Sequence, residues 1–340
     1  MPVVSANELE RLAAAILHRL GAPGDIAGIV AESLVEANLL GHDSHGVIQL
    51  LRYASKVAEG SLQPAARATV RRRQGATATV DGGWGFGHPA AHLAVATAAP
   101  LAAEFGIAAV VVERVNHVGR LGEYVEALAA AGQIGIATAA GAGRGGSVAP
   151  FGGRERIFGT NPIAIAVPVP SHRPPLVIDF ATAAIAAGKI DIALAEGKPL
   201  PEGVLLDAAG VPTTDPAAFA AGGALLPFGG HKGSGLMLMI ELVTSVLAGF
   251  APASSTEWQP GNPALLIALA VDAFTSRERF ARLTEELLHR VESSAPAEGV
   301  AEVLLPGALE ARTRAKRERE GIPVPEPTWR QLIALRDGDR

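Results

Sequence analysis

The spacing of apolar residues changes its period at about residue 66, and this change limits the folds open to the chain. Before it, three amphipathic helical patterns follow one another, and the first begins with a capping box formed by Ser5 and Glu8. After it, strand-like and helix-like patterns alternate, which predicts an α/β domain. We expect strands at about residues 76–81, 107–112, 134–139, 163–169, 176–180 and 264–270, and helices at about residues 5–20, 25–40, 47–60, 89–104, 123–131, 234–250, 277–291 and 312–320.

Helical patterns return near the end of the chain, so the two helical ends are expected to pack together around the central sheet. The predicted domains are a helical part at 1–75, an α/β domain at 76–272 and C-terminal helices at 273–340 that pack back on the first part. The residues from Arg312 to Glu320 mix acidic and basic side chains and predict a solvated helix. The apolar stretch from Ser234 to Phe250 is shorter than the roughly 20 residues of a membrane span, so we expect a core helix.

The amino-acid composition excludes several classes of protein function. The chain has 340 residues, 49% of them hydrophobic, no cysteine and a formal net charge of −5. The lack of cysteine excludes disulfides, thiolate metal sites and a cysteine nucleophile. The net charge is small for this length and spread along the chain, so we expect no basic surface for nucleic acid. We expect no membrane segment and a cytoplasmic location, because the first residues lack a signal-peptide pattern.

The segment Gly41-His42-Asp43-Ser44-His45-Gly46 concentrates proton-handling groups in a connection between two predicted helices. Catalytic groups often lie on loops that a rigid scaffold positions. An imidazole with an ordinary pKa of about 6.5 gives and takes a proton near neutral pH. His45 is therefore our leading acid/base candidate, and the alternative is a loop histidine that hydrogen-bonds its own backbone.

Two further segments carry histidine at positions suited to ligand binding. His117 follows a predicted strand, and the carboxyl ends of strands commonly bind ligands in α/β proteins; the alternative is a helix cap. Lys232 and Gly233 lie where a helix begins, which suits an anion such as phosphate or carboxylate, although a cap with a solvated lysine is also possible. His88 and His92 are four residues apart and form a possible metal pair, but packing and solvent contact explain them better.

A dinucleotide-binding fingerprint is matched by Gly85-Phe86-Gly87-His88-Pro89-Ala90, which opens a predicted helix. The strand before it, residues 76–81, alternates apolar and polar residues, whereas a central parallel strand is almost continuously apolar. We therefore expect an edge or one-sided strand and no Rossmann fold.

Six motifs, taken together and in order, resemble the malate/L-lactate dehydrogenase family, which lacks a Rossmann fold. The resemblance extends from about Val4 to Trp329. The sequence of the segment from Arg114 to Tyr124 is most similar to the hydroxycarboxylate dehydrogenase branch. The motifs are Gly41-His42-Asp43-Ser44-His45-Gly46-Val47, Asn116-His117 with Gly119-Arg120-Leu121-Gly122-Glu123-Tyr124, Gly159-Thr160-Asn161-Pro162, Asp179-Phe180-Ala181-Thr182, Gly188-Lys189-Ile190 and Gly230-His231-Lys232-Gly233.

This resemblance implies a homodimeric NAD(P)-dependent oxidoreductase that interconverts 2-oxo and 2-hydroxy acids, with a mixed, largely antiparallel sheet in its cofactor domain. It implies His45 as proton donor and acceptor, Ser44 as its orienting partner and His117 as a further catalytic group. The cofactor-binding residues it implies are His117, Gly119, Arg120, Leu121, Asp179, Phe180, Ala181, Lys232 and Gly233. The residues assigned to the substrate are Gln49, Arg52 and Thr160, and no metal is expected.

The chain departs from the family pattern at several positions. Gln49 stands where many members have an arginine that holds the substrate carboxylate. We expect either Arg52 or Arg120 to take over that role, or the substrate to be bound mainly through its apolar side chain. Ala183, Ala187 and Ser234 also differ from the usual residues. The alternatives are a catalytically weak or inactive nucleotide-binding dimeric relative, a reductase of cyclic imino acids and, with least support, a histidine-ligated metal hydrolase.

Overall fold

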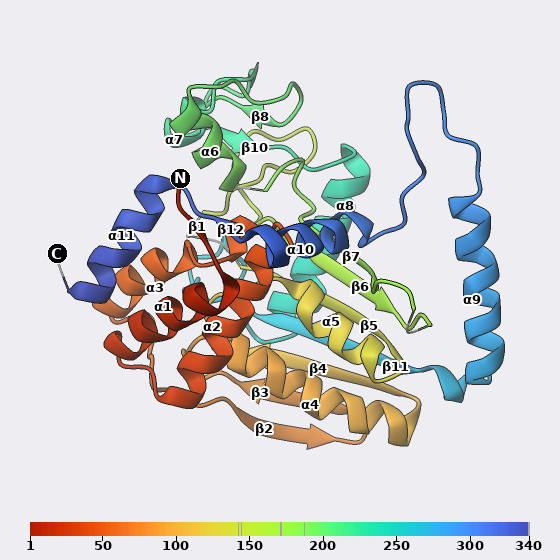
Figure 1. Ribbon diagram of the computed structural model, residues 1–340. Coiled ribbons are helices and arrows are strands. Elements are labelled where there is room, and N and C mark those ends of the chain that lie inside the picture. The colour runs from red at the N-terminus through yellow and green to blue at the C-terminus, as the bar shows by residue number, and fades with distance from the viewer. Residues whose placement is uncertain (142, 144, 171, 187, 339–340) are drawn as a thin grey trace.

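A mixed seven-stranded sheet forms the centre of the molecule (Figure 1). The computed structural model describes residues 1–141, 143, 145–170, 172–186 and 188–338. The strand order is β2-β3-β4-β11-β5-β6-β7, and every neighbouring pair is antiparallel except β3 and β4. This confirms the mixed, largely antiparallel sheet. Its strands are β2 (Thr69–Gln74), β3 (Thr77–Asp81), β4 (Ile107–Glu113), β11 (Ala264–Ala270), β5 (Gln133–Ala139), β6 (Ile163–Val167) and β7 (Leu176–Phe180).

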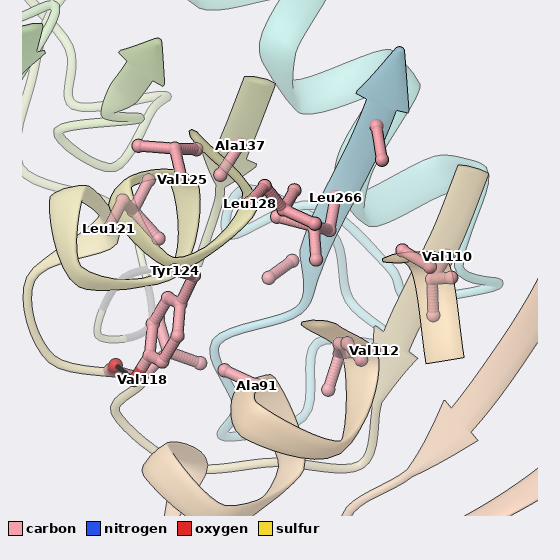
Figure 2. Close-up of a cluster of buried hydrophobic side chains, with 14 of the residues drawn as sticks. Ala91, Val110, Val112, Val118, Leu121, Tyr124, Val125, Leu128, Ala137 and Leu266 are labelled. Atoms are coloured by element: carbon pink, nitrogen blue, oxygen red, sulfur yellow. Dashed lines mark hydrogen bonds between the residues drawn. The ribbon is translucent and has the colours of Figure 1, made fainter. Parts of the chain in front are cut away.

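Helices α4 (Gly87–Phe105) and α5 (Leu121–Ala130) pack against this sheet and form its largest hydrophobic core. The buried face of α4 consists largely of alanine, so the helix lies close to β4 and β11. Leu128 of α5 lies beside Leu266 of β11, and Tyr124 of the same helix points toward Val118 and Ala91 (Figure 2); both α5 side chains are fully buried. Burial of each such large side chain contributes about 1.5–3 kcal/mol to stability.

The two ends of the chain meet in a second core (Figure 1). Helix α1 contacts α2 and α11, α10 contacts α2, and β1 pairs with β12. The expected packing of the helical ends is thus confirmed, while the domain boundaries stay a prediction. The elements are β1 (Val3–Val4), α1 (Ala6–Arg19), α2 (Gly24–Leu39), α3 (Gln49–Ala58), α10 (Ala308–Glu320), β12 (Ile322–Pro323) and α11 (Glu326–Asp337).

Helix α10 has no buried residue, as expected of a solvated helix, but one of its faces makes specific bonds. Arg314 pairs with Glu36 of α2, and Arg317 pairs with Asp43. The sequence pattern showed the mixture of charges on α10 but not which of them find partners.

A smaller lobe lies above the sheet edge in Figure 1 and has a third core. It contains α6 (Gly188–Glu196), β8 (Leu205–Leu206), β9 (Pro212–Thr213), α7 (Ala217–Ala220) and β10 (Ala224–Leu225). Helix α9 (Arg277–Glu292) stands apart at the other side of the molecule, where Arg173 bonds to Glu285 and Glu292.

The prediction of a core helix at residues 234–250 was wrong, because only one side of this helix is buried. Helix α8 (His231–Glu241) continues as a π-helical segment, Leu242–Val246. Met237 and Ile240 are buried, but several large apolar side chains are exposed, because this chain covers only one side of a helix that is apolar all round. The exposed residues are Leu238, Met239, Leu242, Val243, Val246 and Leu247. None of the helices in the described part of the chain is long and apolar enough to cross a membrane.

The fingerprint-like segment does lie in a parallel β3–α4–β4 unit, yet the N-terminus of α4 is covered by protein. The amide of Gly87 donates to the carbonyl of His117 at 3.2 Å, and a Cβ on Gly87 would lie 2.3 Å from that oxygen. A pyrophosphate at a helix N-terminus needs open amides, so the match carries no nucleotide site. Strand β3 is one-sided as expected, with Ala78 and Val80 buried, but it is not an edge strand because β2 pairs with it.

This close approach predicts that Gly87→Ala is destabilising. The added methyl must displace the His117 backbone, and overpacking of this kind costs about 1–3 kcal/mol. The measurement is the free energy of unfolding in denaturant. The control is Gly28→Ala in α2, where a Cβ meets nothing within 4 Å and alanine is expected to stabilise the helix by about 0.5–1 kcal/mol. Equal stability of the two variants would contradict this packing.

Candidate active site

The histidine-rich connection between α2 and α3 is a short 3-10 turn, Asp43–His45, that neighbouring side chains hold in place. Asn38 donates to Asp43 at 2.6 Å and accepts from the amide of Val47 at 2.9 Å. Arg317 donates to both carboxylate oxygens of Asp43, at 2.6 and 2.9 Å. A Cβ at Gly46 would lie 2.2 Å from Asn38 Oδ1, so only glycine fits there. The turn is therefore held by Asn38 of α2, near the start of the chain, and by Arg317 of α10, near its end.

His45 lies at the end of this turn and is largely shielded from water. Ser44 Oγ lies 3.1 Å from its Nδ1, an arrangement that orients the ring. Gln49 donates its amide to the carbonyl of Ser44 at 2.5 Å. Burial lowers the pKa of His45 to about 4, and the charges of His42, Arg120 and Arg52 add to this effect. The ring is neutral at pH 7 in the free protein and ready to accept a proton.

His117 lies beside His45, with the ring centroids 5.5 Å apart and nearly stacked. Tyr53 of α3 reaches its Nδ1 with the hydroxyl at 2.9 Å. Burial, followed by repulsion from His45 and His88, holds the pKa of His117 well below its ordinary value. The buried Asn116 next to it donates to the carbonyl of Trp84 at 2.8 Å, which fixes the position of this loop.

Arg120 and Asp179 approach the same site from the loop before α5 and the end of β7. Arg120 is 3% exposed and pairs with Glu126. Asp179 accepts from the amide of Gly122 at 2.7 Å, and burial raises its pKa to about 6. Arg120 lowers the pKa of His45 and of Asp179, so its positive charge lies between the histidine turn and this carboxylate.

The segment that follows β7 connects this region with α8. The amide of Phe228 donates to the carbonyl of Thr182 at 2.9 Å, and the rings of Phe180 and Phe228 meet at 5.7 Å. A Cβ on Gly233 would lie 1.9 Å from the carbonyl oxygen of Phe228. At the other end of the segment, a Cβ on Gly188 would lie 3.1 Å from that of Ser44. Gly188 therefore allows a close approach to the histidine turn, and Gly233 allows a close approach of α8 to Phe228.

A cavity of about 570 Å³ opens at the N-terminus of α8. Phe151, Phe228, Gly229 and Gly230 are among its lining residues. The next residues are His231 and Lys232, both exposed. An open helix N-terminus with a lysine beside it favours an anionic ligand.

The structure brings most of the expected site residues together. Contacts or charge effects link one group directly, namely Ser44, His45, Gln49, Arg52, His117, Gly119, Arg120, Leu121 and Asp179. Phe228 links the remaining residues to this group. The ring of Phe180 contacts that of Phe228, and Gly233 packs against the carbonyl of Phe228. Ala181 and Lys232 are their neighbours in the sequence. Thr160 lies beneath the segment after β7, where its carbonyl accepts from Thr182 at 2.9 Å. Ala187 lies outside the described residues.

Four contributors to the site did not stand out in the sequence. Tyr53 was expected only as part of an apolar helix face, and His88 was set aside as packing. Asn38 and Arg317 fasten the histidine turn, although neither belongs to a motif. The one signal for Arg317 was its spacing of three residues from Arg314, which places both on one face of α10.

Metal-ligand geometry is not found in the described part of the chain: no three or more His, Asp or Glu side chains cluster as a metal site would require. His92 bonds to Glu123 instead, with Nε2 2.8 Å from Oε1. Two of the residues that depart from the family pattern make contacts within the chain. Ser234 Oγ accepts from the amide of Phe151 at 3.0 Å, and Ala183 forms a β-bridge with Pro227.

The fold thus places a cluster of imidazoles, His45, His117 and His88, outside any Rossmann unit. The family model described as malate/L-lactate dehydrogenase matches residues 4–333. Hydroxycarboxylate dehydrogenase B of Escherichia coli is 36% identical over 334 residues, covering 96% of this chain and 91% of that protein. The chain belongs to the malate/L-lactate dehydrogenase family, a family of oxidoreductases, and the resemblance drawn from its motifs is confirmed.

Solved structures agree with this assignment. Sulfolactate dehydrogenase from Methanocaldococcus jannaschii superposes with a TM-score of 0.88 at 34% identity and covers 99% of this chain and 97% of that one. The Δ1-piperideine-2-carboxylate reductase from Pseudomonas syringae gives a TM-score of 0.87 at 33% identity, covering 98% and 100%. The α/β fold without a Rossmann unit is therefore shared across relatives with different substrates.

The buried histidines predict a protein that loses stability in acid. His45 and His88 have pKa values of about 4 when folded against 6.5 when unfolded, and His117 is lowered as well. The unfolded chain therefore binds more protons below pH 6.5, and each group costs about 1.4 kcal/mol per pH unit as the pH falls from there toward 4. The raised pKa values of Asp179, Glu113 and Glu126 act in the opposite direction, whereas the lowered pKa values of Asp81 and Glu123 add to the loss in acid.

The measurement is the free energy of unfolding between pH 7 and 5. His88→Leu is expected to flatten the pH dependence by up to about 1.4 kcal/mol per pH unit. His172→Leu, at a side chain that is 69% exposed, should leave it unchanged. A stability that is flat over this range in the wild type would rule out the buried neutral state of these rings.

Proposed function

We propose that this protein is an NAD(P)-dependent oxidoreductase that interconverts 2-oxo and 2-hydroxy acids, with His45 as proton donor and acceptor. The observation that carries the proposal is the fixed histidine turn, in which Ser44 orients His45 beside His117. Family membership and relatives named as dehydrogenases of hydroxycarboxylates and sulfolactate support the same reaction.

The residues around α8 suit a dinucleotide. Exposed Lys232 and the open N-terminus of α8 favour its phosphates, and the adjoining cavity of about 570 Å³ leaves room for a nucleoside. We assign Gly119, Arg120, Leu121, Asp179, Phe180 and Ala181 to the part nearer His45. Bound NAD(P)H supplies the hydride in reduction, and NAD(P)⁺ accepts it in oxidation.

His45 handles the proton at the substrate oxygen. With its pKa lowered to about 4, the neutral ring of the free protein is prepared to take the hydroxyl proton of a 2-hydroxy acid. In the reductive direction, the carboxylate of a bound oxoacid places a negative charge nearby, which raises the pKa of His45 and favours the imidazolium donor. His117 stacks on the ring of His45 and is itself fixed by the hydroxyl of Tyr53, so the proton is delivered at a fixed position.

Arg52 is the proposed partner of the substrate carboxylate. It lies one turn after Gln49 on α3, lowers the pKa of both His45 and His117 by its charge, and has no hydrogen-bond or ion-pair partner among the described residues. Gln49 is committed to the carbonyl of Ser44, and Arg120 is paired with Glu126. Arg52 therefore replaces the arginine that many relatives have at position 49.

Two companion proposals complete this function. We infer a homodimer, because the exposed apolar side chains of α8 and its π segment need a covering surface; the molar mass in solution tests this. Reduction of cyclic imino acids is the second candidate activity, favoured by the relative from Pseudomonas syringae that is named for it. A nucleotide-binding protein without turnover would show cofactor binding but no loss of NAD(P)H absorbance with any oxoacid or imino acid.

The central prediction concerns His45→Ala. With the proton donor removed, turnover of 2-oxoacids should fall by about two to four orders of magnitude, while cofactor affinity stays nearly intact. The measurements are NAD(P)H consumption and cofactor titration by fluorescence. The control is His172→Ala, an exposed histidine whose Nε2 lies 3.9 Å from Glu285 of α9 and which should keep wild-type turnover. Undiminished turnover in His45→Ala would remove this residue from the mechanism.

Arg52→Gln should act on binding instead. Loss of the guanidinium is expected to raise the KM for 2-oxoacids by about ten- to a hundredfold, with a smaller change in kcat, because a charged pair to the carboxylate is lost in ground and transition states alike. Arg72→Gln on the edge strand β2, where Arg72 bonds to Gln74, is the control. An unchanged KM in Arg52→Gln would place the carboxylate elsewhere.

A further inference from the structure

His88 is a buried titratable group that the proposed reaction does not use. It is the second residue of α4 and is 1% exposed, and neither ring nitrogen has a hydrogen-bond partner among the described residues. Leaving a buried polar group unpartnered costs about 1–3 kcal/mol, so packing alone gives histidine no advantage over an apolar residue here. The ring lies 6.1 Å from that of His117, which is itself 5.5 Å from His45. Three imidazoles thus follow one another from the proposed reacting group into the protein.

A second pair of titratable groups continues this line to the surface. His92 lies one helical turn after His88 on α4, with Nε2 2.8 Å from Oε1 of Glu123 on α5. Ser33 of α2 donates to the same carboxylate oxygen at 2.7 Å. The side chain of His92 is 39% exposed and that of Glu123 is 16% exposed. The outer end of the line therefore reaches solvent where α2, α4 and α5 meet.

The charges around His88 allow its ring to be protonated briefly but keep it neutral at equilibrium near pH 7. Burial lowers the pKa of His88 to about 4, the charge of Glu123 raises it, and His92 and His45 lower it further. The other titratable neighbours are His117 from the loop before α5 and Tyr53 from α3. Glu123 is the one negative charge among these groups, and it lies on the outer side of His88.

We propose that His88, Glu123 and His92 form a proton-exchange route between solvent and the pair His117 and His45. The inference rests on the proposed function, in which each reduction takes one proton from His45. One proton enters at His92 and Glu123, moves by way of His88 and His117, and reprotonates His45; in oxidation one proton leaves by the same groups. Because both ring nitrogens of His88 lack a partner among the described residues in the resting structure, its hydrogen bonds to the neighbouring groups form only during the transfer. No other atom and no electron moves along the route. A bound oxoacid and dinucleotide exclude water from the front of His45, so exchange from behind keeps turnover going.

Small proton carriers test this route in His92→Gln and Glu123→Gln. In weak buffer, both variants should lose about tenfold in reductive kcat with unchanged KM, and added imidazole should restore the rate, because external proton carriers substitute for a lost relay. The matched control is His172→Gln, which removes an exposed histidine that also faces a glutamate, with Nε2 3.9 Å from Glu285. It should behave as the wild type at every buffer concentration.

Two outcomes overturn the route. A loss that imidazole does not restore in either variant means that these residues support the structure only, and rates equal to the wild type mean that protons exchange elsewhere. A second measurement needs no turnover: in the substrate-free protein with ¹⁵N-labelled histidine, exchange of the imidazole N–H protons of His88 and His117 with water should slow in His92→Gln. If the wild type reduces no oxoacid, the proposed function fails, and this exchange still decides whether the route exists.

Discussion

The ion pair between Asp43 and Arg317 is the contact on which the site depends. It joins a turn near the beginning of the chain to a helix near its end, and Asn38 completes the attachment from α2. The side chain of Arg317 is 15% exposed and that of Asp43 is 46% exposed, so solvent screens the pair only in part. The position of His45 is thereby set by the docking of the two helical ends, not by the turn alone.

Behind this turn, the protein tolerates an unusual concentration of buried imidazoles. His88 is fully buried, His45 and His117 are partly exposed, and all three are kept neutral by burial and by neighbouring positive charges. Such an arrangement costs stability in acid, and it suits proton transfer because a ring that takes up a proton here releases it readily. The partly exposed His92 and Glu123 connect the same cluster to solvent at the junction of three helices.

Close backbone approaches explain why a βαβ unit with a dinucleotide-like fingerprint binds no nucleotide at that position. Gly87 lets the carbonyl of His117 occupy the helix terminus, so the loop that carries His117 is held where a pyrophosphate would otherwise lie. The helix terminus to which we assign an anion is instead that of α8, beside an open cavity.

The sequence by itself determined the order of most helices and strands, because hydrophobic period and caps are local properties, although helices α6, α7 and α11 were not expected. Its six motifs also determined the family. What only the tertiary structure decided are the contacts between distant segments. Tyr53 beside His117, Arg317 on Asp43 and the placement of His88 depend on how α3, α10 and α4 pack, and no local pattern encodes that packing. The same reason explains why the apolar stretch of α8 was expected in the core: periodicity shows that a helix is apolar all round, but only the assembled chain shows which side it covers.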